Sequence, residues 1–363
     1  MLGYCGEVPL LLSPVSNKGM NRFPFFGLLL CLSCIAVGQD DLRVAFRDGL
    51  YGYIDRSGTF VIEPRFIEAS GWDDGAARVR LPDGEFAFID SSGKYLMQPR
   101  QFDRLGDLSE GLAIFEPKGA RYDTDGFVKD VGFIDVTGRV VITPHLFAAY
   151  DFSEGVAAAS VRFNTCGYID RQGNFVIKPA FEFPSYQACG LFSEGLAHVM
   201  KGGKFGYIDH MGSFVIRPLY DNAYDFSEGY AVVGIGSRYV FIDKRGAVLG
   251  TSSYGFARAF SEGLAPVAPN VKWGFIGKSG HLAIPTKYEE VGGFSEGLAW
   301  VRINGKCGYI NVHGDLVVPA KYDRATDFWN GIAEVVQNPT REGDPEVRTI
   351  IDTTGTSVSL GRR

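Results

Sequence analysis

The sequence predicts an all-β protein, built as a tandem repeat of about nine three-stranded β-meanders with a period of about 34 residues. Two observations predict this class. The phrase Phe-Ser-Glu-Gly, followed by Tyr or Leu and then Ala, begins at Phe226, Phe260 and Phe294. Its glycine recurs in steps of 34 residues, at positions 195, 229, 263, 297 and 331. Because units of such a period stack into one body, we expect a single repeat array over residues 39–363.

Each unit is predicted to hold three strands separated by turns. In one unit the strands are residues 264–267, 273–276 and 281–284. The middle strand follows the pattern aromatic-Gly-aromatic-Ile-Asp and recurs, with substitutions, at residues 51–55, 86–90, 131–135, 166–170, 205–209, 239–243, 273–277 and 307–311. A degenerate ninth copy ends at Asp352, which gives nine units.

The aspartate that ends the middle strand and the glycine three residues later predict a tight turn. An aspartate carboxylate accepts backbone N–H bonds at the first position of a type I turn, and glycine takes the left-handed position that closes the hairpin. Asp55 with Gly58 and Asp170 with Gly173 are two examples. We therefore interpret these aspartates as turn residues and not as catalytic groups.

Two other repeated residues predict how the strands pack and end. Glycine inside a strand signals a close approach, so we interpret the mid-strand glycine as space for an aromatic side chain of the neighbouring unit. A proline such as Pro319 is expected to end the third strand, since proline cannot donate to a ladder. The aromatic and acidic residues that follow, such as Tyr322 and Asp323, form either a short fourth strand or a packed loop.

A glutamate recurs in the Ser-Glu-Gly turns and raises the question of a cation site. The copies are Glu110, Glu154, Glu194, Glu228, Glu262 and Glu296. If each unit adds three strands at about 4.8 Å, equivalent glutamates lie about 14 Å apart, too far to share a metal ion. We interpret them as a solvated or turn-bonded row and predict no metal site.

The N-terminal region is typical of a secretory signal peptide. Residues 23–37 form an apolar run that follows Arg22, and small residues precede Gln39. The run is shorter than the about 20 residues that a membrane-spanning helix needs. We predict cleavage after Gly38, with residues 1–38 as an N-terminal extension and signal peptide.

The predicted signal makes the protein secreted or periplasmic, with no membrane span after cleavage. Met20 lies directly before the basic flank, which makes it a candidate start of translation. A lipoprotein signal with Cys34 as the lipidated residue is the alternative.

Three cysteines remain beyond the predicted signal: Cys166, Cys189 and Cys307. Cys166 and Cys307 share one repeat position, where other units carry an aromatic residue, which favours small buried apolar fillers. An oxidising compartment also permits a disulfide between Cys166 and Cys189. Whether these two pair is open at this stage.

Charge and motif content argue against several function classes. The net charge of −6 and the pI near 5.5 provide no basic footprint for nucleic acid. The five histidines are scattered, and the sequence has no nucleophile elbow and no Gly-rich phosphate loop. We therefore predict a protein that is not an enzyme and that uses no cofactor.

The repeated pattern resembles the WG-containing repeat, also called the KWG repeat, over about residues 42–358. Asp-x-x-Gly, Phe-Ser-Glu-Gly-Leu-Ala and the aromatic-Gly-aromatic-Ile strand carry the resemblance, although only Trp273-Gly274 has the literal Trp-Gly. The resemblance implies a β-rich, non-enzymatic bacterial repeat protein, and it brings no catalytic residues to transfer.

The number and phase of the units favour an open, curved solenoid. The array begins with a complete unit at residues 42–63 and ends with one at residues 332–360, so no unit is split between the termini. Nine units also exceed the about four to eight blades that are usual for a propeller. A propeller-like ring is the alternative, because a 34-residue unit with a fourth strand approaches a small blade.

Function is expected where the period is broken. Three insertions lie at residues 116–130, 182–190 and 337–347. The first and last occupy equivalent hairpins and should project from the same edge, where insertions in repeat proteins often form the binding face. Arg121, Tyr122 and Asp123 are the candidate binding residues.

Two functions remain from this reading. The first is a secreted or periplasmic scaffold that binds a protein partner. The alternative is a cell-envelope or polysaccharide-binding module, motivated by the many aromatic residues, although packing between stacked hairpins also explains them. An open groove lined by Tyr254, Trp300 and Trp329 would favour the glycan.

Overall fold

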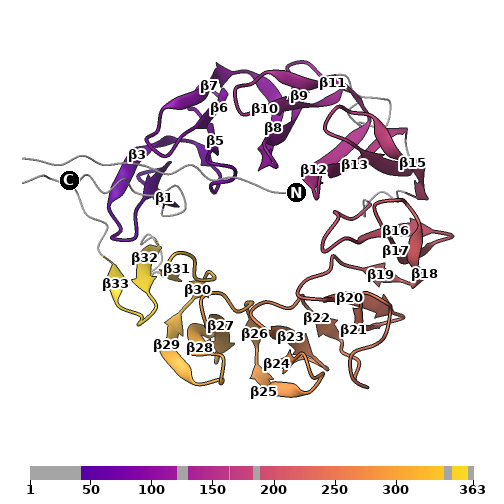
Figure 1. Ribbon diagram of the computed structural model, residues 1–363. Coiled ribbons are helices and arrows are strands. Elements are labelled where there is room, and N and C mark those ends of the chain that lie inside the picture. The colour runs from indigo at the N-terminus through magenta and orange to yellow at the C-terminus, as the bar shows by residue number, and fades with distance from the viewer. Residues whose placement is uncertain (1–41, 121–129, 163, 183–188, 339–345, 359–363) are drawn as a thin grey trace, which may run out of the picture. The chain divides into compact units, whose positions relative to one another are not determined.

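All of the regular structure that is described is β-strand. The structure, a computed structural model, describes residues 42–120, 130–162, 164–182, 189–338 and 346–358. Figure 1 shows small antiparallel sheets that follow one another in chain order. Within the described ranges the strands form eight sheets that hold nine repeats, numbered here as units 1 to 9, and one seven-stranded sheet holds both unit 4 and unit 5. This confirms the predicted all-β repeat.

The strands of the first units are β1 (Arg43–Arg47), β2 (Leu50–Ile54) and β3 (Phe60–Phe66) in unit 1, β4 (Glu68–Ala69), β5 (Ala77–Arg80), β6 (Phe86–Ile89) and β7 (Tyr95–Arg100) in unit 2, and β8 (Phe102–Ser109), β9 (Leu112–Pro117), β10 (Val131–Asp135) and β11 (Val140–Leu146) in unit 3. Those of the middle units are β12 (Ala148–Ser153), β13 (Val156–Arg162), β14 (Thr165–Ile169) and β15 (Phe175–Glu182) in unit 4, β16 (Ala197–Lys201), β17 (Lys204–Ile208) and β18 (Phe214–Tyr220) in unit 5, and β19 (Asn222–Ala223), β20 (Tyr230–Ile235) and β21 (Arg238–Asp243) in unit 6. Those of the last units are β22 (Phe256–Ala257), β23 (Leu264–Ala268), β24 (Trp273–Gly277) and β25 (Leu282–Tyr288) in unit 7, β26 (Glu290–Val291), β27 (Leu298–Ile303), β28 (Lys306–Asn311) and β29 (Leu316–Tyr322) in unit 8, and β30 (Arg324–Ala325), β31 (Ile332–Gln337), β32 (Val347–Asp352) and β33 (Ser357–Val358) in unit 9.

A complete unit has four strands, one more than the predicted meander. The segment after the aromatic and acidic residues, left open as strand or loop, forms the short first strand of the next unit. In unit 8, β26 pairs with β27 through Glu290 opposite Arg302 and Val291 opposite Val301. The four strands then pair antiparallel in chain order.

The last strand of a unit continues through the proline that was expected to end it. In unit 8, β29 contains Pro319 and pairs with β28 on both sides of that residue. Cys307 lies opposite Tyr322 and Tyr309 opposite Val318, so between these two pairs one residue of β28 faces three residues of β29. The extra residues form a bulge, where a residue without a donor is tolerated.

The mid-strand glycine makes room for this bulge and not, as expected, for an aromatic ring of the neighbouring unit. A Cβ atom on Gly308 would lie 2.5 Å from the Val318 carbonyl oxygen, in the same sheet. The same close approach of backbone occurs at Gly52, Gly132, Gly167, Gly206 and Gly274. Unit 2 has Ala87 at this position, and its bulge is one residue smaller, with Phe86 opposite Arg100 and Phe88 opposite Met97.

The predicted Asp-x-x-Gly turns are confirmed. In unit 1, Asp55 Oδ1 accepts hydrogen bonds from the Ser57 amide at 2.9 Å and the Thr59 amide at 3.0 Å. The Gly58 amide donates to the Asp55 carbonyl oxygen at 2.9 Å, and Gly58 has a φ of 77°. These carboxylates therefore close hairpins.

The Ser-Glu-Gly turns form a continuous set of contacts between units, which we call the turn belt (residues 109–111, 153–155, 193–195, 227–229, 261–263 and 295–297). Each belt serine donates its hydroxyl to the carbonyl oxygen of the Phe that precedes the next turn, at 2.6 to 2.8 Å. Each belt glutamate accepts the amide of the next unit's turn glycine, at 2.7 to 3.3 Å. The glutamates are thus bonded to turns, as one of the two sequence interpretations held.

The hydrophobic core lies between neighbouring units. At each of seven described junctions an aromatic ring on one unit's third strand (the second described strand in units 1 and 5) contacts the ring that precedes the next unit's turn, with centroids 4.7 to 5.1 Å apart. The pairs are Tyr53–Trp72, Phe133–Phe152, Tyr168–Phe192, Tyr207–Phe226, Phe241–Phe260, Phe275–Phe294 and Tyr309–Phe328. The aromatic load is therefore used for packing between units.

The first and last units also pack on each other. Ile54 and Phe60 of unit 1 share one buried cluster with Ile332 and Ile350 of unit 9. Arg43 Nη1 donates to the Ile332 carbonyl oxygen at 2.8 Å. These contacts favour the ring over the open solenoid, because they close the array of units on itself.

The cysteines divide into a pair and a single thiol. Cys166 and Cys189 form a disulfide with Cα atoms 6.3 Å apart, which answers the question left open by the sequence. Cys307 is a buried free thiol, as expected of a small core residue, and burial raises its pKa.

Gly308→Ala tests the role of the mid-strand glycine. The added methyl group would meet the backbone of β29, so we expect a loss of about 2 kcal/mol in the free energy of unfolding. Gly277→Ala is the control, because a Cβ there meets no atom within 4 Å. Urea unfolding of both variants measures the difference, and equal stability of the two would contradict the bulge account.

The turn belt predicts acid sensitivity. Burial raises the pKa of Glu194, but hydrogen bonds from Lys244 and the Gly229 amide outweigh it, so the pKa lies below the ordinary 4.5. Glu228 follows the same pattern with Lys278 and the Gly263 amide. Carboxylates with lowered pKa stabilise the fold above the unfolded-state pKa and lose that contribution as pH falls below it.

We therefore expect the double variant Glu194→Gln, Glu228→Gln to lose less stability than the wild type between pH 6 and about pH 3.5. Glutamine can still accept the glycine amide, so the variant removes charge and keeps the hydrogen bond. Urea midpoints at the two pH values provide the measurement, and parallel losses in both proteins would disprove the contribution of these carboxylates.

Candidate functional site

The predicted binding residues Arg121, Tyr122 and Asp123 lie outside the described residues. The two ends of their insertion are described, because Glu116 belongs to the end of β9 and Val131 begins β10. Among the described residues no group of three or more His, Cys, Asp or Glu side chains is placed to hold a metal ion. No helix in those same ranges is long and apolar enough to cross a membrane.

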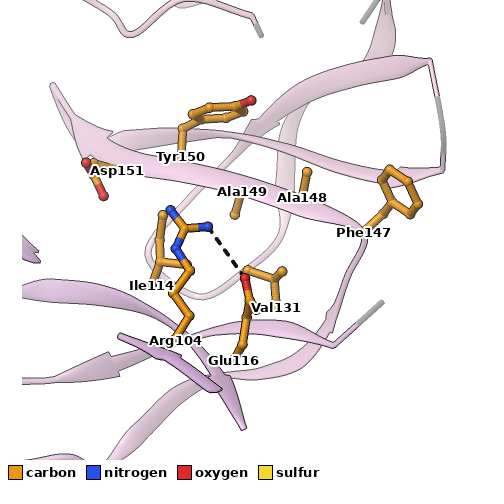
Figure 2. A pocket seen from close by; sticks show the side chains of 9 residues that line it. All are labelled: Arg104, Ile114, Glu116, Val131, Phe147, Ala148, Ala149, Tyr150 and Asp151. Atoms are coloured by element: carbon orange, nitrogen blue, oxygen red, sulfur yellow. Dashed lines mark hydrogen bonds and ion pairs between the residues drawn. The ribbon is translucent and has the colours of Figure 1, made fainter. Parts of the chain in front are cut away.

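A cavity of about 320 Å³ lies between units 3 and 4, at the base of the first insertion. Figure 2 shows its lining, with Arg104, Glu116 and Val131 facing the strand that carries Tyr150 and Asp151. The lining residues are Arg104, Ile114, Glu116, Val131, Phe147, Ala148, Ala149, Tyr150 and Asp151. The small side chains of Ala148 and Ala149 leave this space unfilled.

Glu116 is a buried carboxylate in the wall of the cavity. Its exposed fraction is 7%, and Arg104 Nη1 lies 3.5 Å from its Oε1, the limit of a hydrogen bond. The Arg104 side chain is itself 61% exposed. Within the described ranges the Glu116 carboxylate makes no other hydrogen bond or ion pair, so this one long contact holds a buried carboxylate.

In two other units the equivalent pair of facing residues on the first and second strands carries the two charges the other way round. Glu68 faces Arg80 in unit 2 at 2.8 Å, and Glu290 faces Arg302 in unit 8 at 3.3 Å. In both, the carboxylate is on the first strand and the guanidinium on the second. Unit 3 reverses this order and places the carboxylate of Glu116 on the buried second strand.

Asp151 lies at the mouth of the cavity without a hydrogen bond or an ion pair to any described residue. Burial is the largest effect on the Asp151 carboxyl and raises its pKa. The nearby charges of Asp107 and Asp73 raise this pKa further, whereas Arg104 lowers it. Burial also raises the pKa of the neighbouring Tyr150. The local field is therefore net negative despite Arg104.

A second cavity, of about 310 Å³, lies where unit 9 meets unit 1. Its lining consists of Arg56, Glu296, Asn330, Gly331, Ile332 and Asp352. Glu296 already accepts the Gly331 amide at 2.7 Å, and Asp352 closes its own turn. The carboxylates of Glu296 and Asp352 are therefore already hydrogen-bonded to backbone amides of turns.

The three aromatic residues proposed for a glycan groove do not line one together. Tyr254 is 5% exposed and packs in the cluster between units 6 and 7. Trp300 is half-buried against the cluster between units 8 and 9, whereas Trp329 is 40% exposed. This arrangement does not favour the glycan interpretation.

Exchange of the charges at the cavity wall tests the reversed pair. Glu116→Arg alone places two guanidinium groups opposite each other, and we expect it to destabilise the protein by about 1 to 2 kcal/mol. Adding Arg104→Glu recreates the order of units 2 and 8 and should restore stability. Urea unfolding of both variants checks this, and a double variant no more stable than the single would contradict the assignment.

Comparison with known proteins supports the repeat assignment. A family model described as WG containing repeat matches residues 51–84, 86–122, 132–162, 167–205, 205–239, 273–307 and 308–338, well over half of the chain. No curated protein shows a significant match in sequence.

Several solved structures are similar in fold. One described as a eukaryotic initiation factor has a TM-score of 0.59 at 11% identity, covering 86% of this chain and 93% of its own. BamB from Moraxella catarrhalis has a TM-score of 0.47 at 11% identity, covering 82% and 97%. The designed Ika8 protein has a TM-score of 0.44 at 12% identity, covering 74% and 91%. At such identity the first likeness shows the fold alone. The seven matched repeats, together with the nine structural units, show that the chain belongs to the WG containing repeat family.

Proposed function

We propose that the protein is a non-catalytic scaffold, secreted or periplasmic, that binds a protein partner at the cavity between units 3 and 4. The observation that carries the proposal is the cavity itself, which opens at the base of an insertion into an otherwise regular β-repeat. Repeat proteins commonly bind through such departures. The residues that recur in every unit meanwhile form turns and pack the units together.

The disulfide supports the proposed compartment. Cys166 and Cys189 pair across 23 residues, and disulfides of this kind persist in oxidising compartments. The apolar run at residues 23–37 adds to this argument, since it is typical of a signal peptide. Both features favour export from the cytosol.

The glycan-binding alternative has less support. A sugar-binding surface usually exposes aromatic rings, whereas the rings of this protein largely pack between units. We therefore place the partner among proteins.

A pull-down with the chain from Gln39 to Arg363 tests the function. Tyr150→Ala should weaken capture of the partner from envelope extract at least tenfold, because exposed tyrosines at a cavity are frequent hot spots. Tyr224→Ala is the matched control, since Tyr224 holds the equivalent position in unit 6 and is 48% exposed. Glycan sedimentation is run in parallel, and retention of glycan without any protein would overturn the proposal.

The compartment has its own test. We expect mature protein to begin at Gln39 by peptide mass and to show Cys166 and Cys189 resistant to alkylation before reduction. Cys166→Ser should lower the free energy of unfolding by about 3 kcal/mol, the contribution of a loop of this length. Full-length, uncleaved chain in the cytosol would contradict the signal peptide.

A further inference from the structure

At the junctions between units, the residue types at two facing positions are matched, and the junction that holds the cavity is an exception. The rule concerns two positions: the residue that follows the repeated alanine of one unit, such as Ala77, Ala113 or Ala299, and the residue two before the serine position of the next unit's turn. Where the second position is aspartate, the first position carries Arg, His or Trp: Arg78 Nε donates to Asp107 Oδ1 at 2.7 Å. His198 Nδ1 lies 3.1 Å from Asp225 Oδ1, without forming a hydrogen bond to it.

The third example is Trp300, whose indole donates to Asp327. Where the first position is apolar, the second lacks a carboxylate, as with Val232 followed by Ala259 and Pro266 followed by Gly293. The two positions are thus matched at five junctions. At three of these junctions an Arg, His or Trp side chain lies next to the aspartate of the following unit.

The junction between units 3 and 4 is the exception. It has Asp151 at the second position but Ile114 at the first. Ile114 is buried in the cavity wall and cannot donate a hydrogen bond. Instead, Ile114 and Asp151 both border the cavity of about 320 Å³ between units 3 and 4.

From this arrangement we propose that the cavity binds an arginine side chain of the partner protein, whose guanidinium supplies the donor that Ile114 lacks. The inference rests on the proposed scaffold function and names the chemistry of its partner. Arg78 with Asp107 is the internal precedent, because it is the same contact made within the chain.

The charges of the cavity suit a cation. Asp151 and Glu116 contribute two carboxylates, against the single guanidinium of Arg104. Glu116 is 7% exposed and is held by one contact of 3.5 Å, so an entering cation would gain a charge-assisted hydrogen bond. This carboxylate is independent of the junction rule, because it lies on the ladder of unit 3 itself.

The shape favours guanidinium over ammonium. Carboxylates on two different walls, from β9 and β12, match the several N–H donors of a planar fork (Figure 2). An ammonium group is a compact point charge and would satisfy fewer of these groups at once.

The test uses the chain from Gln39 to Arg363 and the probe N-acetyl-L-argininamide. Titration calorimetry at low salt should show saturable binding of this probe and at least tenfold weaker binding of N-acetyl-L-citrullinamide, its uncharged near-isostere. Asp151→Asn should weaken binding of the arginine probe about tenfold, as expected for loss of a charged hydrogen-bond partner. Asp327→Asn is the matched control and should change it less than twofold, because Trp300 already fills that junction.

Ile114→Arg provides the converse variant, since it installs within the chain the residue that unit 2 carries. It should abolish binding of the arginine probe while circular dichroism confirms the fold. Equal binding of the citrulline derivative, or unchanged binding to Asp151→Asn, would overturn the proposal whether or not Ile114→Arg folds.

The pull-down separates this inference from the function on which it rests. If the wild type and Ile114→Arg capture a partner equally, the scaffold stands and the arginine site is wrong. If neither captures a partner while the arginine probe binds and depends on Asp151, the arginine site stands and the scaffold function falls.

Discussion

The hydrogen bond from a turn glycine to the glutamate of the preceding unit is the contact on which the rest of this protein depends. It requires the belt glutamates to adopt a φ of 51 to 55°, a left-handed conformation that costs a non-glycine residue about 1 kcal/mol or more. The carboxylate offsets this by reaching the next turn, where Lys244 and Lys278 also meet two of the glutamates. Each unit therefore fixes the position of its successor, and the aromatic pairs can meet at one separation throughout. The same contact explains why Ser, Glu and Gly recur together.

Features that depend on residues close together in the chain could be predicted from the sequence. The Asp-x-x-Gly hairpins, the nine units and the packing role of the aromatics follow from spacing and residue type. The bulge opposite Gly308 was missed, since a glycine reports close approach but not which group approaches. Closure was weighed as the alternative but could not be decided, because Arg43 and Ile332 meet across 289 residues and carry no repeated signal. The pairing of Cys166 with Cys189 was weighed but could not be decided, because spacing alone does not bring two loops together.

For the candidate site, too, the sequence indicated some features and not others. The ends of the insertion at residues 116–130 border the cavity that we propose as the binding site, but the named residues Arg121, Tyr122 and Asp123 lie outside the described ranges. Ile114 and Asp151 were not singled out, although a comparison of equivalent positions would have found them. Every other aspartate of this kind follows a unit that offers Arg, His or Trp. The informative position is thus one where the repeat keeps the acceptor and loses the donor.

Closure of the array can be tested at its two ends, because the terminal units of an open array and of a closed array differ in stability. The units of an open solenoid contact only their neighbours, so its terminal units fray first. Native-state hydrogen exchange measures this directly. A closed array predicts that the amides of β1 and β31 open with the same free energy as those of β17 and β20 in the middle of the chain. Opening of β1 and β31 at a clearly lower free energy, with β17 and β20 still protected, would contradict closure.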